Sequence, residues 1–314
     1  MTALLRRLPT DPLPTPLVAI GNFDGVHLGH QAIIRRAVDG ARAVTGTSVV
    51  LTFDPHPVSV LRPEMPFALL TTLDQKLDVM TALGVEVVVA LPFTPEFARR
   101  SAEQFVREDL GERLGAREVY VGRNFAFGKG REGGVEALQR FGESFGMQVV
   151  IQPPIMVDGT MVSSSTIRGL LRDGRVADAA TLLGRPHRLD GTVAHGEGRG
   201  RELGYPTANI LPGLQMLPKV GIYAALIDDL TTGERALHGV VYLGSQPTFG
   251  PHELQLEVHL FGASVSRYGH RFRVAFMDWI RGEERFATPD ALVAQIARDV
   301  AAARAALEGG TGSA

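Results

Sequence analysis

Residues 21–30, with the sequence G-N-F-D-G-V-H-L-G-H, place glycines, an aspartate and two histidines where they could bind phosphate. The segment follows an apolar run at 17–20 and precedes residues 31–38, which have a helical pattern. Because His27 and His30 are three residues apart, they share one face at the N-terminus of that helix. Backbone N–H groups and the helix dipole favour anions there, and imidazoles can donate to phosphoryl oxygens. The pattern predicts a polyphosphate site; the alternative is two histidines that only cap and pack the helix.

A serine-rich segment at 162–168, V-S-S-S-T-I-R, is a second candidate phosphate-binding element. Ser165 can cap a helix that begins at Thr166, and Arg168 lies one turn into it with a guanidinium suited to phosphate. An ordinary serine-rich helix cap is the alternative. His56 stands between two prolines at the end of an apolar run, a fixed position that suits either a ligand contact or a structural turn.

Residues 195–204, H-G-E-G-R-G-R-E-L-G, form a glycine-rich stretch in the second half of the chain. Glycines allow backbone N–H groups to approach phosphate closely, and Arg199 supplies positive charge. Thr207 and Asn209 follow at alternate positions of an expected strand, so their side-chain oxygens lie on one face. A hydroxyl and an amide carbonyl are sparse, neutral ligands for Mg²⁺, whose octahedron water and ATP phosphates can complete. A bare glycine-rich hairpin is the alternative.

Glu257 is a carboxylate that could act as a general base. In residues 254–260, L-Q-L-E-V-H-L, apolar side chains occupy one strand face, and Glu257 shares the other with Gln255 and His259. By itself this alternation indicates a solvated carboxylate on a strand.

The elements that must position these residues fall into two groups. In the first half, apolar runs alternate with helical patterns, which predicts a mostly parallel sheet covered on both faces, with ligands at the carboxyl ends of its strands. Strands are expected at 17–20, 48–53, 85–91, 118–121 and 148–152, and helices at 31–43, 72–83, 102–114 and 134–145.

After a helical pair at 165–173 and 176–183, the pattern changes to short strands separated by turns. This predicts a small antiparallel barrel or sandwich, closed by a helix at 288–307 with Thr288 as N-cap and Pro289 at its first position. Strands are expected at 187–194, 207–210, 221–228, 239–243, 255–261 and 271–280. The domain boundary is placed at residue 184, giving domains 1–183 and 184–314.

Composition narrows the class of protein. The chain has 314 residues, 45% of them hydrophobic, and a formal net charge of −2, so no general basic field favours nucleic acid. It has no cysteine, which excludes disulfides, thiolate catalysis and cysteine-ligated zinc. No segment has the pattern of a signal peptide or the ~20 apolar residues of a membrane span, so a cytoplasmic protein without membrane partners is expected.

Residues 21–30 resemble the signature of the HxGH nucleotidyltransferases, α/β enzymes that attach AMP or CMP to a phosphate. Further segments narrow the resemblance to the bacterial bifunctional riboflavin kinase/FMN adenylyltransferases (FAD synthetases). They occur in the family's order and span roughly residues 15–290: T-F-D-P-H-P at 52–57, V-G-R-N-F-A-F-G-K-G-R-E-G-G at 121–134, V-S-S-S-T-I-R at 162–168, G-Y-P-T-A-N-I at 204–210 and L-E-V-H-L-F at 256–261.

The resemblance implies a nucleotidyltransferase-like parallel-sheet domain followed by a riboflavin kinase β-barrel with a C-terminal helix. The barrel would phosphorylate riboflavin to FMN, and the first domain would adenylylate FMN to FAD, with ATP as co-substrate, Mg²⁺ as cofactor and small molecules as the partners. Two other possibilities are a barrel that binds flavin without kinase activity, and an HxGH enzyme acting on phosphopantetheine or a nicotinamide mononucleotide.

The resemblance also assigns roles to individual residues. It implies catalysis by His27, His30 and Glu257, with Mg²⁺ held by Thr207 and Asn209. Nucleotide and phosphate contacts are expected at Gly21, Phe23, Asp24, Gly29, Ser163, Ser164, Ser165, Arg168, Gly196, Gly198, Arg199, Gly200 and Gly204. Flavin contacts are expected at His56, Asn124, Arg281 and Glu283.

Two positions and one short segment depart from the family pattern. Asn124 stands where many relatives carry aspartate, and Tyr242 stands where relatives usually carry asparagine. Residues 263–267 replace a more acidic stretch. These departures concern flavin contacts more than the chemistry of the two reactions.

Overall fold

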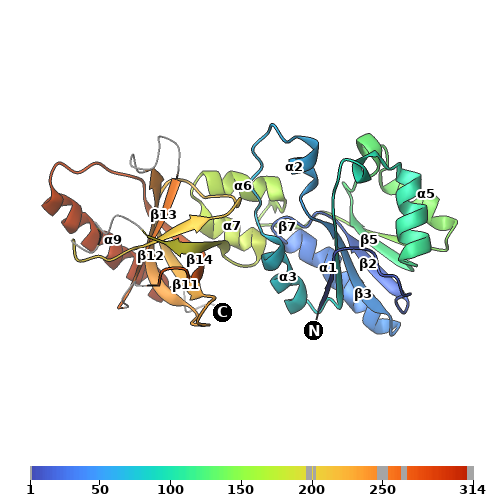
Figure 1. Cartoon of the computed structure of the whole chain (residues 1–314), viewed down its shortest axis with the longest axis horizontal. Helices are drawn as coiled ribbons and strands as arrows, with labels where there is room; N and C mark the ends of the chain where they lie inside the picture. The colour runs from blue at the N-terminus through green and yellow to red at the C-terminus, as the bar shows by residue number, and fades with distance from the viewer. Residues whose placement is uncertain (1, 196–199, 201–202, 246–253, 263–266, 310–314) are drawn as a thin grey trace. The chain divides into compact units, whose positions relative to one another are not determined.

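A computed structural model describes residues 2–195, 200, 203–245, 254–262 and 267–309 of the chain (Figure 1). The chain divides into two compact units, Met1–Ser164 and Ser165–Ala314. Helices α6 (Ser164–Arg172) and α7 (Val176–Leu183) precede the predicted boundary at residue 184, yet they fall almost wholly in the second unit. The boundary at 184 itself stays a prediction.

The first unit is built on a six-stranded parallel sheet in the order β1-β4-β3-β2-β5-β6. This confirms the predicted sheet. One strand was not expected: β1 has only three residues, too few to show a pattern. The strands are β1 (Ala3–Leu5), β2 (Pro16–Ile20), β3 (Thr47–Phe53), β4 (Val87–Leu91), β5 (Glu118–Gly122) and β6 (Gln148–Gln152).

Side chains of β2 alternate between two hydrophobic cores, one on each face of the sheet. Leu17 and Ala19 pack beneath α1 (Leu28–Ala43) and α3 (Leu73–Ala82), whereas Val18 and Ile20 face the opposite core. That second core includes α5 (Val135–Glu143) and η2 (Phe105–Arg113), which continues α4 (Ala102–Gln104) as a π-helix. Shorter elements are α2 (Pro57–Leu61), η1 (Phe97–Arg99), η3 (Lys129–Arg131), β7 (Met156–Val157) and β8 (Thr160–Met161).

The second unit contains a closed antiparallel barrel in the order β10-β13-β12-β11-β14-β9. The predicted barrel and its six strands are confirmed. They are β9 (His187–Ala194), β10 (Ala208–Pro212), β11 (Gly221–Asp229), β12 (Leu237–Ser245), β13 (Leu254–Leu260) and β14 (Arg271–Arg281). The last helix, α9 (Pro289–Gly309), begins as predicted, with the Thr288 hydroxyl accepting from the backbone N–H of Ala291 at 3.2 Å.

Alternate residues of the barrel strands face its interior and its outer surface. Val241 and Val258 pair across β12 and β13 and are fully buried, as expected of a filled small barrel. On the outer face, Ala303 and Leu307 of α9 pack in a cluster that includes Ile222. The kinase candidates Asn209 and Glu257 pair directly with each other across β10 and β13 and therefore lie on one face.

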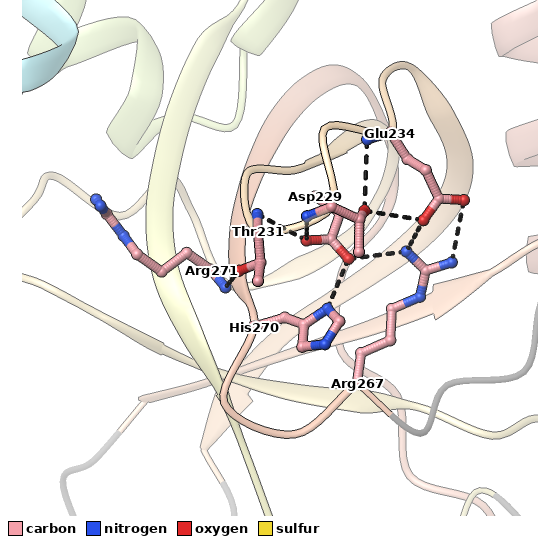
Figure 2. A network of polar contacts seen from close by, with 7 residues as sticks. Asp229, Thr231, Glu234, Arg267, His270 and Arg271 are labelled. Atoms are coloured by element: carbon pink, nitrogen blue, oxygen red, sulfur yellow. Dashed lines mark hydrogen bonds and ion pairs between the residues drawn. The ribbon is translucent and has the colours of Figure 1, made fainter.

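A polar network ties the turn after β11 to the segment before β14 (Figure 2). Asp229 is fully buried, and its carboxylate accepts from Arg267 and from His270 Nδ1, each at 2.8 Å. The same carboxylate accepts from the backbone N–H of Thr231 at 3.0 Å. Burial opposes ionisation of Asp229, but these hydrogen bonds outweigh it and hold its pKa well below the usual value of 3.8.

We expect Asp229→Asn to lower the free energy of unfolding by about 1.5–3 kcal/mol at neutral pH, because a charge-assisted hydrogen-bond set is lost. Since the pKa of Asp229 is lower in the folded chain than the unfolded value of 3.8, its stabilisation is complete above that pH and is lost as pH falls below it. Urea titrations of wild type and variant should therefore differ fully at pH 7, and the difference should begin to shrink as pH falls below 3.8. A difference that stays constant from pH 7 down to pH 3 would contradict the role of the charge.

Candidate active sites

The turn between β2 and α1 holds unusual backbone conformations at the carboxyl end of the sheet. Phe23 and Val26 have φ angles of 47° and 37°, a region that side chains rarely adopt, and Gly25 has φ 90°. Each such non-glycine residue costs on the order of 1–3 kcal/mol. Phe23 and Val26 are 1% and 0% exposed, so packing of their side chains offsets the strain. Strain that the surroundings hold in place is typical of functional turns.

His27 and His30 meet at the start of α1, as the sequence predicted. Their rings stack with centroids 3.6 Å apart, and Phe23 contacts the His30 ring edge-on at 5.3 Å. His27 caps the helix, because its Nδ1 accepts from the backbone N–H of His30 at 3.2 Å. A neutral His27 with Nδ1 as acceptor carries its proton on Nε2, which is the donor that a phosphoryl oxygen requires.

Asp24 connects this turn to distant segments of the first unit. Its carboxylate accepts from the backbone N–H groups of Leu70 at 2.9 Å and Thr71 at 3.3 Å, and it is 3% exposed. Its carbonyl oxygen accepts from the hydroxyl of Ser164 at 2.9 Å. The structure thus joins two motifs that lie 140 residues apart in sequence. The contacts show Asp24 holding the turn in place, and its expected contact with nucleotide stays a prediction.

Lys76 and Thr52 support the same turn, and sequence reasoning missed both. The Lys76 ammonium donates to the carbonyl oxygen of Asn22 at 2.9 Å, and the Thr52 hydroxyl donates to it at 3.2 Å. Lys76 is 3% exposed, and burial lowers its pKa although nearby Asp24 opposes the shift. A signal was present: Lys76 shares the buried face of α3 with Met80, four residues later.

A pocket of about 450 Å³ is lined by Gly21 and Asn22 of this turn and by six phenylalanines, among other residues. Its volume is in the range of small-molecule sites. Several rings contact one another edge-on or stacked, including Phe125 on Phe127 at 5.3 Å. The aromatic lining consists of Phe53, Phe93, Phe97, Phe105, Phe125 and Phe127. Such a wall suits a flat, aromatic ligand beside the histidine-bearing turn.

The two flavin candidates of the first unit are placed differently. Asn124 lines the phenylalanine-rich pocket, with its exposed side chain following β5. His56 caps α2, where its Nδ1 accepts from the backbone N–H of Val58 at 3.2 Å and its ring stacks on Phe67 at 4.4 Å. Val58 lines the pocket, so His56 shapes the wall through α2.

The remaining nucleotide candidates of the first half are glycines that lie close to aromatic rings, and residues at or near the start of α6. A Cβ on Gly21 would lie 3.2 Å from the ring of Phe23, and one on Gly29 would lie 3.2 Å from the ring of His27. The predicted cap at Ser165 is wrong: α6 begins at Ser164, so Ser165 is its second residue and Ser163 is the residue that directly precedes the helix. Arg168 lies one turn into α6. Ser165 and Arg168 belong to the second unit.

In the barrel, Thr207, Asn209 and Glu257, which the family resemblance assigns to the kinase reaction, lie next to one another. Asn209 and Glu257 are direct cross-strand partners, and the Thr207 hydroxyl donates to Glu257 Oε2 at 3.2 Å. Glu257 is half-buried between the buried Leu256 and Val258. His259 fixes the adjacent segment, with its Nδ1 2.9 Å from the carbonyl oxygen of Pro206.

The glycine-rich stretch approaches the same residues. Gly200 lies so close that a Cβ there would be 2.4 Å from the Tyr205 carbonyl oxygen and 3.2 Å from the Thr207 hydroxyl. Gly204 has φ 82°, a conformation that favours glycine. The other candidates of this stretch, Gly196, Gly198 and Arg199, lie outside the described residues.

The two flavin candidates of the barrel are both engaged with neighbouring side chains. Arg281 forms a two-pronged ion pair with the buried Asp299 of α9 at 2.7 and 2.8 Å, and this contact raises the pKa of Arg281. Glu283 accepts a hydrogen bond from the hydroxyl of Tyr242 at 2.5 Å. The ion pair gives Arg281 a structural function in attaching α9, and its contact with flavin stays a prediction.

The oxygen donors of the barrel site fit Mg²⁺ in kind. Thr207 and Asn209 offer a hydroxyl and an amide oxygen beside the Glu257 carboxylate, and hard cations prefer oxygen ligands. Within the described ranges no group of three or more histidines, aspartates or glutamates could hold a metal ion. A site here would depend on few protein ligands, completed by ATP phosphates and water.

Comparison with known proteins gives matches in both halves. The family model for FAD synthetase matches residues 12–166, and that for riboflavin kinase matches residues 183–307. Two curated relatives carry the name bifunctional riboflavin kinase/FMN adenylyltransferase. The Escherichia coli (strain K12) protein is 37% identical over 92% of this chain and 91% of its own length. The Pseudomonas fluorescens protein is 37% identical over 92% of both.

A solved structure also resembles the chain along most of its length. It is titled a macrolide-efflux protein from Streptococcus pneumoniae, and it is 30% identical with a TM-score of 0.84, covering 95% of this chain and 97% of its own. Across the residues that the structure describes here, we find no helix long and apolar enough to span a bilayer.

Proposed function

The chain belongs to the family of bifunctional riboflavin kinase/FMN adenylyltransferases, and from that premise we propose which residues perform each reaction. It is an enzyme of flavin-cofactor biosynthesis that phosphorylates riboflavin to FMN with ATP, and transfers an adenylyl group from ATP to FMN, giving FAD and pyrophosphate. Adenylyl transfer belongs to the FAD synthetase part and phosphorylation to the riboflavin kinase part. The flavin-binding barrel without kinase activity and the enzyme for another phosphate acceptor are therefore set aside.

We assign adenylyl transfer to the strained turn and its two histidines. A phosphate oxygen of FMN attacks the α-phosphorus of ATP, and the bond to pyrophosphate breaks. The nucleophile is already an anion, so positioning and charge stabilisation supply most of the rate. The stacked pair of His27 and His30 carries this proposal, because it presents imidazole donors at a helix N-terminus. Asp24, Thr52 and Lys76 hold the turn that carries the pair.

The phenylalanine-rich pocket is proposed to bind the isoalloxazine ring of FMN, with Asn124 at its polar edge. Phe125→Ala should raise the KM for FMN about three- to ten-fold, because one stacked aromatic contact is lost. This KM is measured from the steady-state rate of FAD formation at a series of FMN concentrations. Phe145→Ala removes a 40%-exposed phenylalanine of the same unit that packs on Gly111, and it should leave this KM unchanged. Equal effects of both substitutions would contradict the assignment.

Phosphorylation is assigned to the cross-strand pair of Asn209 and Glu257, together with Thr207, which donates a hydrogen bond to Glu257. Glu257 takes the proton of the ribityl hydroxyl, whose oxygen attacks the γ-phosphorus of ATP as the bond to ADP breaks. Thr207 donates to the carboxylate and so orients it. Thr207 and Asn209 would hold Mg²⁺, which neutralises phosphate charge when bound. Their contact with Glu257 is the observation that carries this half of the proposal.

One assay tests the whole assignment. The purified chain is incubated with riboflavin, ATP and Mg²⁺, and the flavins are resolved by chromatography; FMN should appear first and FAD after it. Riboflavin left untouched while supplied FMN becomes FAD would refute the barrel assignment. Omission of Mg²⁺ with added chelator should stop phosphorylation. Small-molecule substrates are the proposed partners, and the cytoplasm, as the main pool of ATP, is the proposed location.

A further inference from the structure

Tyr242 lies in the barrel site but has no part in the reaction proposed above. It is the direct cross-strand partner of Glu257 between β12 and β13, so both side chains lie on the outer face of the barrel. Its hydroxyl donates to Glu283 Oε1 at 2.5 Å, and its ring is half-buried in the cluster beneath α9. Tyr242 therefore connects β12, the strand paired with that of the proposed base, to the expected flavin contact Glu283.

The backbone of β12 is shaped to accept this pair. Gly244 lies two residues beyond Tyr242 on the same strand face. A Cβ at Gly244 would lie 2.1 Å from the Tyr242 hydroxyl oxygen and 2.2 Å from Glu283 Oε1. These separations are far below van der Waals contact, so the tyrosine and the carboxylate occupy the space that the missing side chain leaves. Glu283 itself is exposed, so this hydrogen bond lies at the surface, and it is the absence of a side chain at Gly244 that makes room for it.

The hydroxyl of Tyr242 remains a donor at neutral pH. Burial of the phenol and its contact with Glu283 raise its pKa well above the usual value of 10, and the nearby charge of Glu257 acts in the same direction. A protonated phenol beside a carboxylate gives a charge-assisted hydrogen bond. The Glu283 carboxylate then keeps further lone pairs for donors of a ligand.

We propose that Tyr242 is a positioning residue of the kinase site, which holds the Glu283 carboxylate in place to accept hydrogen bonds from riboflavin. Riboflavin is uncharged and offers ribityl hydroxyls and one ring N–H as donors, which a fixed carboxylate can accept. The inference rests on the proposed role of Glu257 and on the flavin contact that the family resemblance implies for Glu283. It gives Tyr242 no part in proton transfer, so its effect falls on binding of riboflavin rather than on the chemical step.

Tyr242→Phe tests this, because it removes the hydroxyl and keeps the ring that packs beneath α9. The KM for riboflavin should rise about three- to ten-fold while kcat changes by less than about two-fold, since one hydrogen bond that orients the ligand contact is lost. Glu283→Gln should act in the same direction. The double variant should be no worse than Glu283→Gln alone, because Tyr242 acts only through that carboxylate. An unchanged Tm of each variant is the measure that its barrel is folded, because FAD formation from supplied FMN reports only on the first unit.

Tyr120→Phe is the matched control. Tyr120 donates to Glu118 at 2.5 Å in the parallel sheet of the first unit, so it has the same phenol–carboxylate contact away from the barrel. Its loss should leave the KM for riboflavin unchanged. An unchanged or lower KM with Tyr242→Phe, or additive effects in the double variant, would overturn the inference. If Glu257→Gln kept full kinase activity, the proposed role of Glu257 as base would be wrong, whatever the result with Tyr242→Phe, and the two failures are thereby distinguished.

Discussion

Glu257→Gln is expected to lower the rate of riboflavin phosphorylation by about 10²–10⁴-fold, the usual contribution of a general base. Glutamine keeps the size of the side chain and can still accept from the Thr207 hydroxyl, which now bonds to Glu257 Oε2 at 3.2 Å. It cannot take the proton of the ribityl hydroxyl. The loss should fall on kcat, measured as FMN formed per minute at saturating riboflavin and ATP, while supplied FMN still becomes FAD.

Gln255 provides the control for this prediction. It lies two residues before Glu257 on the same face of β13 and is also half-buried. Gln255→Ala should therefore disturb the strand as much as Glu257→Gln does, without removing a carboxylate, and kinase activity should stay within about two-fold of wild type. Phosphorylation that persists in Glu257→Gln would mean that another group takes the proton, or that the hydroxyl needs no base.

Sequence patterns predicted the elements well wherever one period dominates. The run P-L-V-A-I at 16–20 is buried throughout, as the central strand of a parallel sheet must be. The alternation around Glu257 correctly predicted that its side chain lies on the outer face of the barrel. Thr288 followed by Pro289 marked the start of α9. The sequence did not predict β1, because three residues carry no pattern and the strand is identified only by its pairing with β4.

What the sequence could not show are contacts between segments far apart in the chain. Asp24 and Arg281 each matched a motif, yet one binds backbone groups 46 and 47 residues away and the other pairs with Asp299 on α9. A motif records that a residue type is needed without saying whether it touches a ligand or holds the residue that does. The pocket of phenylalanines is hidden for the same reason, since its rings come from several separate segments between 53 and 127.

His30→Ala is the substitution expected to affect adenylyl transfer most clearly. Loss of one preorganised donor to a developing phosphoryl charge costs about 10²–10³ in rate, so riboflavin and ATP should yield FMN that accumulates with little FAD. His30 is the sharper choice because His27 also caps α1, and its loss would mix catalysis with about 0.5–2 kcal/mol of helix stability. His27→Asn restores a cap without the imidazole donor, and it should also accumulate FMN. Arg35→Ala, at an exposed position of the same helix, should make FAD normally, and a wild-type rate with His30→Ala would move the phosphate site away from this turn.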